Sequence, residues 1–130
     1  MKKKPKSKTK SFYVKKLDRL FSLYIRKKYA DEWGMSSCFT CQKQFHYKDL
    51  QNGHYISRQY MAGRWEESNC RPQCVVCNVF KKGNYTEYAA RLVRDRGAKE
   101  LERLNKLKRT IKQWSIGELK SLIELYEEKS

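Results

Sequence analysis

Apolar residues in the first quarter of the chain recur at the three-to-four spacing of an amphipathic helix. Ser11 is a candidate N-cap, because its hydroxyl can accept a hydrogen bond from the first turn. Basic residues fill the positions between the apolar ones, and a glycine follows where the pattern stops. The pattern predicts a helix from Ser11 to about Trp33–Gly34. Its apolar positions are Leu17, Leu20, Phe21, Tyr24 and Ile25.

Three further helical patterns lie toward the C-terminal end. Residues 85–96 carry apolar positions at helical spacing and stop at Gly97, a residue type that commonly ends helices. Leucines recur over Ala98–Gln113, and Ser115 opens a capping box before a last apolar run. These patterns predict one helix over 85–96 and a helical hairpin over 98–130.

The middle of the chain has short aromatic and polar runs instead of a helical period. Over residues 35–58 these runs predict a two-stranded hairpin with a turn at Asn52–Gly53. Residues 60–73 are predicted to be a loop, because they lack a period and end near a proline. A short helix is expected over 74–82, ending at Gly83–Asn84.

The chain is strongly basic, since 30 Lys and Arg against 14 Asp and Glu give a net charge of +16 over 130 residues. Twelve of the basic residues lie in the first thirty positions, where Asp18 is the one acid. Such a balance favours a polyanionic partner, and nucleic acid is the commonest one. Residues 1–10 are Lys-rich without an apolar period, so we expect a flexible basic tail there.

No apolar run approaches the roughly 20 residues that cross a bilayer, and the Lys-rich start lacks the apolar stretch of a signal peptide. We therefore expect a soluble, cytoplasmic protein with no membrane partner. Five cysteines in a reducing compartment point to metal binding rather than to disulfides.

Four of the five cysteines form two Cys-x-x-Cys pairs separated by 32 residues. Two such knuckles can meet in a tetrahedral thiolate site, which suits zinc because the ion binds sulfur and imposes no competing geometry. Two unlinked thiol-redox motifs and a four-cysteine iron–sulfur centre are the alternatives. Cys70 is left over, and we interpret it as a small buried or idle thiol. We predict a structural Zn2+, closed to water by sulfur, at Cys38, Cys41, Cys74 and Cys77.

The zinc staple would bring the hairpin that carries His54 against the helix that begins at Cys74, as a β-β-α unit. In such a unit a neutral histidine can take a proton from the water that attacks a phosphodiester. The side-chain oxygen of Asn78 can bind a hard divalent ion such as Mg2+. Asn69 can hydrogen-bond across the loop and fix the His54 side of the site. His46 is interpreted as an ordinary packed or surface residue.

Basic side chains flank the proposed site in the sequence and are candidates for contacts with DNA phosphates. A solvated surface position is the alternative for each of them, and it is equally open for the arginines of residues 91–96. The candidates are Arg58, Arg64, Lys81 and Lys82.

The order of the motifs between Cys38 and Tyr88 is Cys-x-x-Cys, Gly-His-Tyr-x-Ser, Asn-x-x-x-Gln-Cys-x-x-Cys-Asn and Gly-Asn-x-x-x-Tyr. This order resembles the NinG/Rap recombination endonucleases of lambdoid phages, which belong to the HNH or ββα-metal class. The Cys-x-x-Cys-Asn segment is also similar to the endonuclease VII family of junction resolvases. Residues 17–26 look like the helix that precedes the motif in NinG proteins, so the resemblance covers about residues 17–97.

The resemblance implies a structure-selective DNA endonuclease that acts on branched recombination intermediates such as Holliday junctions and D-loops. By motif, His54 is the general base, Asn69 is the middle Asn of the HNH pattern, and Asn78 binds a catalytic Mg2+ or Mn2+. Gly53 departs from the class, because many ββα-metal nucleases have Asp or His there as a second metal ligand. The candidates left for the rest of the shell are a backbone carbonyl, waters, phosphate oxygens, Asp49, Glu66 and Glu67.

The whole sequence therefore predicts an α+β fold. A zinc-stapled, HNH-like ββα-metal core with its N-terminal amphipathic helix occupies residues 11–97, after the tail of 1–10 and before the helical hairpin of 98–130. Branched DNA is the expected partner, and a homodimer and phage or host recombination proteins are left open as further ones. Host cytoplasm is the expected location if the chain is phage-encoded. The alternative functions are a non-catalytic zinc-dependent DNA-binding or scaffold module in recombination, and a zinc-ribbon protein that acts on RNA.

Overall fold

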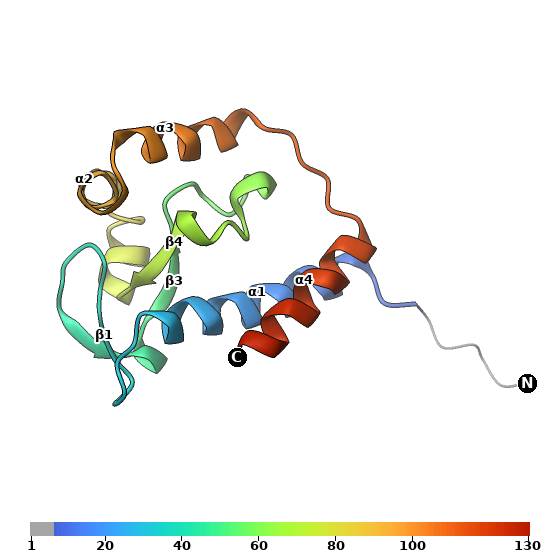
Figure 1. Ribbon diagram of the computed structural model, residues 1–130, viewed down its shortest axis with the longest axis horizontal. Helices are drawn as coiled ribbons and strands as arrows, with labels where there is room; N and C mark the ends of the chain where they lie inside the picture. Colours follow the sequence, from blue (N-terminus) through green and yellow to red (C-terminus); the bar gives the residue numbers. More distant parts are fainter. Residues whose placement is uncertain (1–6) are drawn as a thin grey trace, which may run out of the picture.

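The computed structural model describes residues 7–130, and it confirms the predicted α+β class. A central antiparallel pair, β3 (Gln51–His54) and β4 (Cys70–Gln73), lies between α1 and α4 on one side and α2 and α3 on the other (Figure 1). A second antiparallel pair is formed by β1 (Met35–Ser37) and β2 (Gln44–His46). The helices are α1 (Lys10–Lys28), α2 (Tyr85–Arg96), α3 (Ala98–Lys106) and α4 (Ile116–Lys129), with the 3-10 turns η1 (Tyr47–Asp49), η2 (Met61–Gly63), η3 (Glu67–Asn69) and η5 (Leu107–Arg109) and the π-helix η4 (Val76–Phe80).

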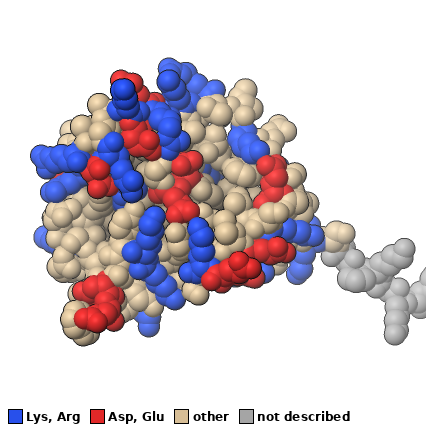
Figure 2. Space-filling view, viewed as in Figure 1, with Lys and Arg blue, Asp and Glu red and all other residues tan. Residues whose placement is uncertain are grey.

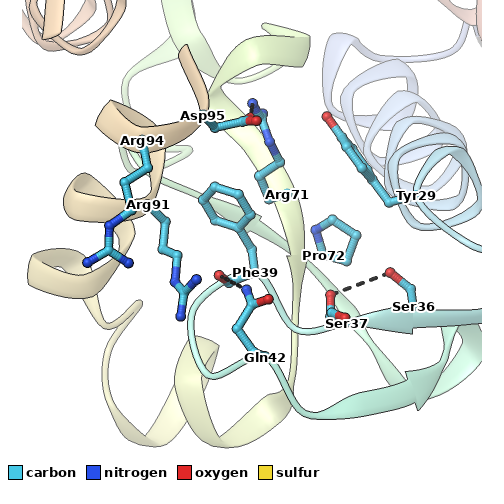
Figure 3. A pocket seen from close by; sticks show the side chains of 10 residues that line it. All are labelled: Tyr29, Ser36, Ser37, Phe39, Gln42, Arg71, Pro72, Arg91, Arg94 and Asp95. Atoms are coloured by element: carbon cyan, nitrogen blue, oxygen red, sulfur yellow. Dashed lines mark hydrogen bonds and ion pairs between the residues drawn. The ribbon is translucent and has the colours of Figure 1, made fainter. Parts of the chain in front are cut away.

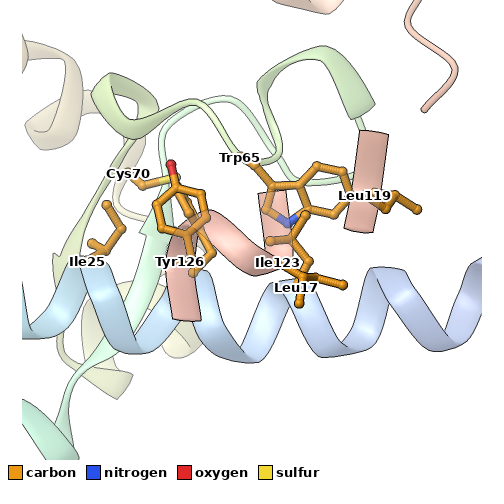
Figure 4. Close-up of a cluster of buried hydrophobic side chains, with 8 residues drawn as sticks. Leu17, Ile25, Trp65, Cys70, Leu119, Ile123 and Tyr126 are labelled. Carbon is orange, nitrogen blue, oxygen red and sulfur yellow. The ribbon is translucent and has the colours of Figure 1, made fainter. Parts of the chain in front are cut away.

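Helix α1 is capped by Thr9 rather than by the predicted Ser11. The Thr9 hydroxyl accepts a hydrogen bond from the N–H of Phe12 at 3.4 Å. The apolar face of the helix packs against α4 and the loop before β4, as Figure 4 shows. The predicted amphipathic helix is therefore present. The buried cluster that it forms consists of Leu17, Phe21, Ile25, Trp65, Cys70, Leu119, Ile123 and Tyr126.

The same helix ends earlier than predicted, at Lys28 instead of near Trp33. The chain turns locally at Asp31, whose carboxylate accepts hydrogen bonds from the N–H groups of Trp33 and Met35, both at 2.9 Å. An aspartate that bonds to the backbone a few residues further on competes with helix formation. The helical period of the sequence gave no sign of this turn, because it depends on one side chain.

The strand pairing differs from the hairpin predicted over residues 35–58. β1 pairs with β2, whereas β3 pairs with β4, which comes from the segment predicted to be a loop. Asn52–Gly53 lies inside β3 rather than in a turn. All four residues of β4 are buried, so the strand lacks the alternation of polar and apolar residues that marks a half-exposed strand.

Gly53 is required by the packing around β3. A Cβ atom there would lie 2.0 Å from Oε1 of Gln73 and 2.6 Å from its Cδ. Gln73 is fully buried, and its side-chain N–H donates to the Thr40 hydroxyl at 3.1 Å and to the Gly83 carbonyl at 3.0 Å. The Tyr88 hydroxyl donates to the carbonyl of Gly53 at 2.7 Å. These bonds join both cysteine segments and α2 to the central strands.

The predicted C-terminal hairpin is not formed, because α3 and α4 pack on different partners. α3 packs against α2, whereas α4 lies along α1 (Figure 1). The helix predicted over 98–113 is shorter, and Ile111 is 93% exposed. The linker to α4 is anchored by Trp114, which stacks edge-on against Trp65 and donates its indole N–H to the Met61 carbonyl at 3.0 Å. The cluster under α2 and α3 consists of Ile56, Tyr88, Leu92 and Leu104.

Other predicted boundaries are confirmed. α2 spans 85–96 and ends at Gly97, which has a φ of 90°. Ser115 and Glu118 cap α4 reciprocally, with both hydrogen bonds at 3.1 Å. The predicted tail lies mostly outside the described residues, and Lys10 already belongs to α1. No helix within residues 7–130 combines the length and apolarity needed to cross a membrane.

Candidate metal centre and catalytic cavity

The four predicted zinc ligands meet between the β1–β2 turn and the start of η4. The Sγ atoms of Cys38, Cys41, Cys74 and Cys77 all lie within 4.8 Å of one another, and those of Cys41 and Cys74 are 3.8 Å apart. Sulfur atoms bound to one tetrahedral zinc at about 2.3 Å lie about 3.8 Å from each other. The cluster therefore fits a structural metal ion such as zinc.

The electrostatics of the cluster also call for a cation. Burial tends to raise the pKa of the Cys38 thiol, but hydrogen bonds from the backbone of Cys41 and Cys74 and from the Thr40 hydroxyl lower it to about 6. Burial, together with the neighbouring Cys38, raises the pKa of Cys41, and it raises that of Cys74 to about 12. Negative charge on the Cys38 sulfur therefore disfavours ionisation of the neighbouring Cys41 and Cys74 thiols. A divalent cation would remove this repulsion and allow all four to act as ligands.

Two backbone turns hold the sulfurs in place. In the first, the Cys38 N–H donates to the Lys43 carbonyl at 2.8 Å, and Gln42 adopts a left-handed φ of 66°. In the second, Asn84 also adopts a left-handed φ, of 49°, and its side-chain N–H donates to the sulfur of Cys77 at 3.8 Å. The Asn of the Gly-Asn motif is therefore a partner of a metal ligand, which orients that sulfur.

A cavity of about 450 Å³ lies beside this cluster and brings His54 and Asn78 together. His54 is the last residue of β3, and Asn78 follows Cys77 directly on η4. The β3–β4 pairing thus positions His54, and the four-cysteine cluster positions the segment that carries Asn78. The polar side chains of the wall come from α1, β3, the following loop and η4; among them are Asp18, Gln51, Asn52, His54, Arg58 and Asn78.

His54 is held so that one ring nitrogen is free. Its Nε2 lies 2.8 Å from the Arg64 carbonyl oxygen, which only accepts, so the neutral ring carries its proton on Nε2 and leaves Nδ1 as the acceptor. Burial lowers the pKa of His54, although the Arg64 carbonyl and the Asp18 carboxylate oppose the shift. The imidazole is therefore neutral at pH 7 and can accept a proton at Nδ1.

The amide of Asn78 is oriented by Gln51, a residue without a role in the sequence prediction. The side-chain N–H of Asn78 donates to Oε1 of Gln51 at 2.8 Å, so the amide oxygen of Asn78 is left as its acceptor. In the same wall, Oδ1 of Asn52 is buried and has no hydrogen-bond partner among residues 7–130. The oxygen donors near Asn78 are thus neutral amides, which hard divalent ions accept as ligands.

Asn69 is fully buried and does not line the cavity. Its Oδ1 accepts a hydrogen bond from the Ile56 N–H at 2.7 Å, and its Nδ2 donates to the carbonyls of Ile56 and Gly63, both at 3.0 Å. These bonds cross the loop, as the sequence predicted, and close the segment that supplies the Arg64 carbonyl to His54. Asn69 therefore closes the loop that carries Arg64, whose carbonyl contacts His54.

Comparison with known proteins decides the family. The family model described as Bacteriophage Lambda NinG protein matches residues 1–130. The chain belongs to the NinG family. Protein ninG of Escherichia phage lambda is 26% identical over 133 residues, which covers 94% of this chain and 57% of the relative. Protein ninG of Enterobacteria phage H19B is 27% identical over 116 residues, which covers 88% of this chain and 55% of the relative.

The chain spans little more than half the length of these NinG relatives. Protein ninG of Escherichia phage 933W is 24% identical over 133 residues, with 94% of this chain and 58% of the relative covered. No solved structure matches the chain. The NinG resemblance drawn from the cysteine and His–Asn motifs is confirmed, whereas the link to the HNH class and to endonuclease VII stays a prediction.

Of the four basic residues predicted to contact DNA, Arg58 lines the cavity of this NinG-family chain and is exposed. The Arg64 side chain is 16% exposed and forms an ion pair with Asp18, with Nε 3.0 Å from Oδ1, so its contact with DNA stays a prediction. Lys81 and Lys82 are exposed just beyond η4, outside the cavity wall. Figure 2 shows a face where Lys and Arg alternate with Asp and Glu, so the positive excess is not one uniform patch there.

The acids proposed to complete the metal shell lie elsewhere. Glu67 accepts hydrogen bonds from the hydroxyls of Tyr24 at 2.9 Å and Tyr126 at 3.0 Å, and its pKa is lowered by these bonds and by nearby lysines against the opposing effect of burial. The carboxylate in the cavity wall is instead Asp18, the acid that stands alone among the first thirty residues. None of the three proposed acids lines the cavity, namely Asp49, Glu66 and Glu67.

A second cavity, of about 440 Å³, lies near Arg71 (Figure 3). His54 on β3 pairs with Cys70 on β4, and Arg71 is the next residue of β4. Because successive side chains of a strand point to opposite faces, Arg71 and His54 lie on opposite faces of the strand pair. The Arg71 side chain is 1% exposed, is held by Asp95 at 3.2 Å, and lies over the Phe39 ring at 5.2 Å. Its contacts are internal, and they anchor α2 to the central strands.

Proposed function

We propose that this chain is a metal-dependent endonuclease that hydrolyses phosphodiester bonds in branched DNA, such as Holliday junctions and D-loops. The observation that carries the proposal is the cavity beside the four-cysteine cluster, which is lined by both a neutral His54 held by the Arg64 carbonyl and an Asn78 held by Gln51. Exposed Arg58 in the same wall supplies a guanidinium for a substrate phosphate.

His54 acts as the general base of the hydrolysis. Its Nδ1 takes a proton from a water molecule while the water oxygen forms a bond to phosphorus and the bond from phosphorus to the 3′ oxygen breaks. The leaving oxygen takes its proton from solvent. The Arg64 carbonyl stabilises the imidazolium that results, because it bonds to the Nε2–H at 2.8 Å, and Asp18 adds a nearby negative charge.

Asn78 is the proposed residue that would hold a catalytic Mg2+ or Mn2+, because its side-chain N–H is engaged by Gln51 and its amide oxygen is left as an acceptor. An ion bound there would supply positive charge against the negative charge that develops on the leaving oxygen. The amide oxygens of this wall suit Mg2+ and Mn2+ better than softer metals. Asn52, whose Oδ1 lacks a partner among the described residues, is a further oxygen donor in the wall.

The substrate class follows from charge and from the family. A net charge of +16 favours a polyanion, and the curated relatives all come from phages. A homodimer fits a junction, which presents paired strands for two incisions. A non-catalytic zinc-dependent DNA-binding module is the second candidate. It is favoured by one observation, which is that Asp18, the carboxylate in the cavity wall, is already engaged by Arg64.

Cleavage of a substrate panel separates the two candidates. Zinc-loaded protein is mixed with a synthetic four-way junction, a D-loop, a flap and plain duplex, each with Mg2+ or Mn2+. The nuclease proposal predicts incision of one or more branched substrates in preference to duplex. Salt-sensitive binding to all four substrates without any incision would instead identify the DNA-binding module.

A further inference from the structure

Exposed apolar side chains border the cavity on one side. On η4, Val76 is 49% exposed, Val79 is 51% exposed and Phe80 is 75% exposed, and we call these three residues the apolar edge. Val79 also lines the cavity with His54. Phenylalanine side chains are usually buried in folded proteins. An exposed group of apolar side chains beside a polar cavity therefore indicates a surface that binds a ligand or a partner molecule.

The apolar edge faces outward because the inward positions of η4 are taken. Cys77 points into the four-cysteine cluster, and the amide of Asn78 bonds to Gln51 in the cavity wall. The π-helical backbone is closed by the Lys81 N–H, which donates to the Val76 carbonyl at 2.8 Å. The edge is therefore presented on a rigid support, which the metal cluster and the cavity wall hold from behind.

The charges around the apolar edge select its partner. Lys81 and Lys82 follow directly and are exposed, and residues 74–86 contain no Asp or Glu. Arg58 is exposed in the wall of the neighbouring cavity. An apolar surface with cations on its borders fits a nucleic-acid base, which has an apolar face and flanking phosphates, better than it fits an apolar protein surface.

We propose that the Phe80 ring stacks on an unpaired base at the branch point of the DNA substrate, with Val76 and Val79 beneath it. Lys81 and Lys82 contact the phosphates on either side of that base. The inference rests on the proposed function for its substrate and adds the reason for preferring branched DNA. Continuous duplex offers no free base face, whereas a branch point does.

The test is a binding measurement without Mg2+ or Mn2+, so that no strand is cut. Zinc-loaded protein binds a four-way junction and a flap with 2-aminopurine at the branch point, and a matched duplex. The wild type should raise the probe emission, because the base leaves its quenching neighbours. Phe80→Ala should abolish this change and weaken junction binding about five- to 150-fold, the range of base–aromatic stacking. Phe80→Trp should retain the junction affinity, because the indole also stacks on a base.

Trp33→Ala is the matched control, because Trp33 is 74% exposed but lies away from the cavity. It should leave the emission change and the affinity as in the wild type. An unchanged emission and affinity in Phe80→Ala would overturn the stacking proposal even if the wild type cuts junctions. A loss confined to Phe80→Ala would support it even if no variant cuts. A dimer in the wild type that Phe80→Ala abolishes in sedimentation would assign the edge to a second copy and overturn the proposal.

Discussion

Asn69→Ala tests how the fold holds His54 in place. The substitution removes three hydrogen bonds at a side chain with 0% exposure. It leaves the N–H and carbonyl of Ile56 unpaired, whereas the carbonyl of Gly63 keeps the Glu66 N–H at 3.3 Å. Each buried polar group left unpaired costs about 1–3 kcal/mol, and a water molecule that enters the space recovers part of this cost, so we expect a loss of about 2–4 kcal/mol in the free energy of unfolding. That is a large share of the roughly 5–15 kcal/mol that holds a domain together.

Urea unfolding of the zinc-loaded protein measures the effect. With a slope of about 2 kcal/mol per molar urea, the unfolding midpoint of Asn69→Ala should fall by about 1–2 M. Asn105→Ala is the control, because Asn105 lies half-buried on α3 and its side chain forms no hydrogen bond within the described chain; its stability should change by less than about 0.5 kcal/mol. Midpoints that agree for Asn69→Ala and Asn105→Ala would refute the loop-closing role.

Three further outcomes are expected. Gly53→Ala should destabilise the fold by about 1–3 kcal/mol in thermal melting, because its Cβ would overlap the buried Gln73 side chain. Gly117→Ala on α4 should stabilise the fold slightly, because its Cβ would meet the Ser115 Oγ at an ordinary contact distance of 3.8 Å; equal shifts of the two variants would contradict the packing argument. Folding lowers the pKa of His54 from its ordinary 6.5, so below that pH the unfolded chain binds more protons than the folded chain, and the free energy of unfolding falls as the pH drops. His54→Gln should reduce this pH dependence in urea titrations. Cys41→Ser should lose bound zinc in metal analysis, and Cys70→Ala should keep it.

Local signals in the sequence located several elements correctly. Helix α2, its end at Gly97 and the capping box at Ser115 depend on neighbouring residues, so their pattern is visible in the chain itself. The four-cysteine cluster was predictable for a similar reason, because Cys-x-x-Cys is a local geometry that needs one partner of the same kind. The placement of His54 and Asn78 in one cavity was expected from that cluster.

Long-range pairings were not visible in the sequence. β4 is buried on both faces and contains Pro72, so neither alternation nor composition marked it as a strand. α3 and α4 each have an apolar face, and which helix each would pack against depends on surfaces that form elsewhere. Asp18 lines the cavity although it lies on α1, far from His54 in the sequence. Gln73 is the Gln of the cysteine motif, and its packing against Gly53, which leaves no room for a side chain there, is visible only in the structure.

The central claim is that His54 takes the proton from the attacking water, and single-turnover cleavage of a four-way junction with Mg2+ tests it most directly. Zinc-loaded wild type should cut the junction, and His54→Gln should bind it equally well but cut at least about 100-fold more slowly. His46→Ala, the other histidine, lies outside the cavity and should cut at the wild-type rate. Equal rates for His54→Gln and wild type, or a folded wild type that leaves every branched substrate intact, would contradict the account.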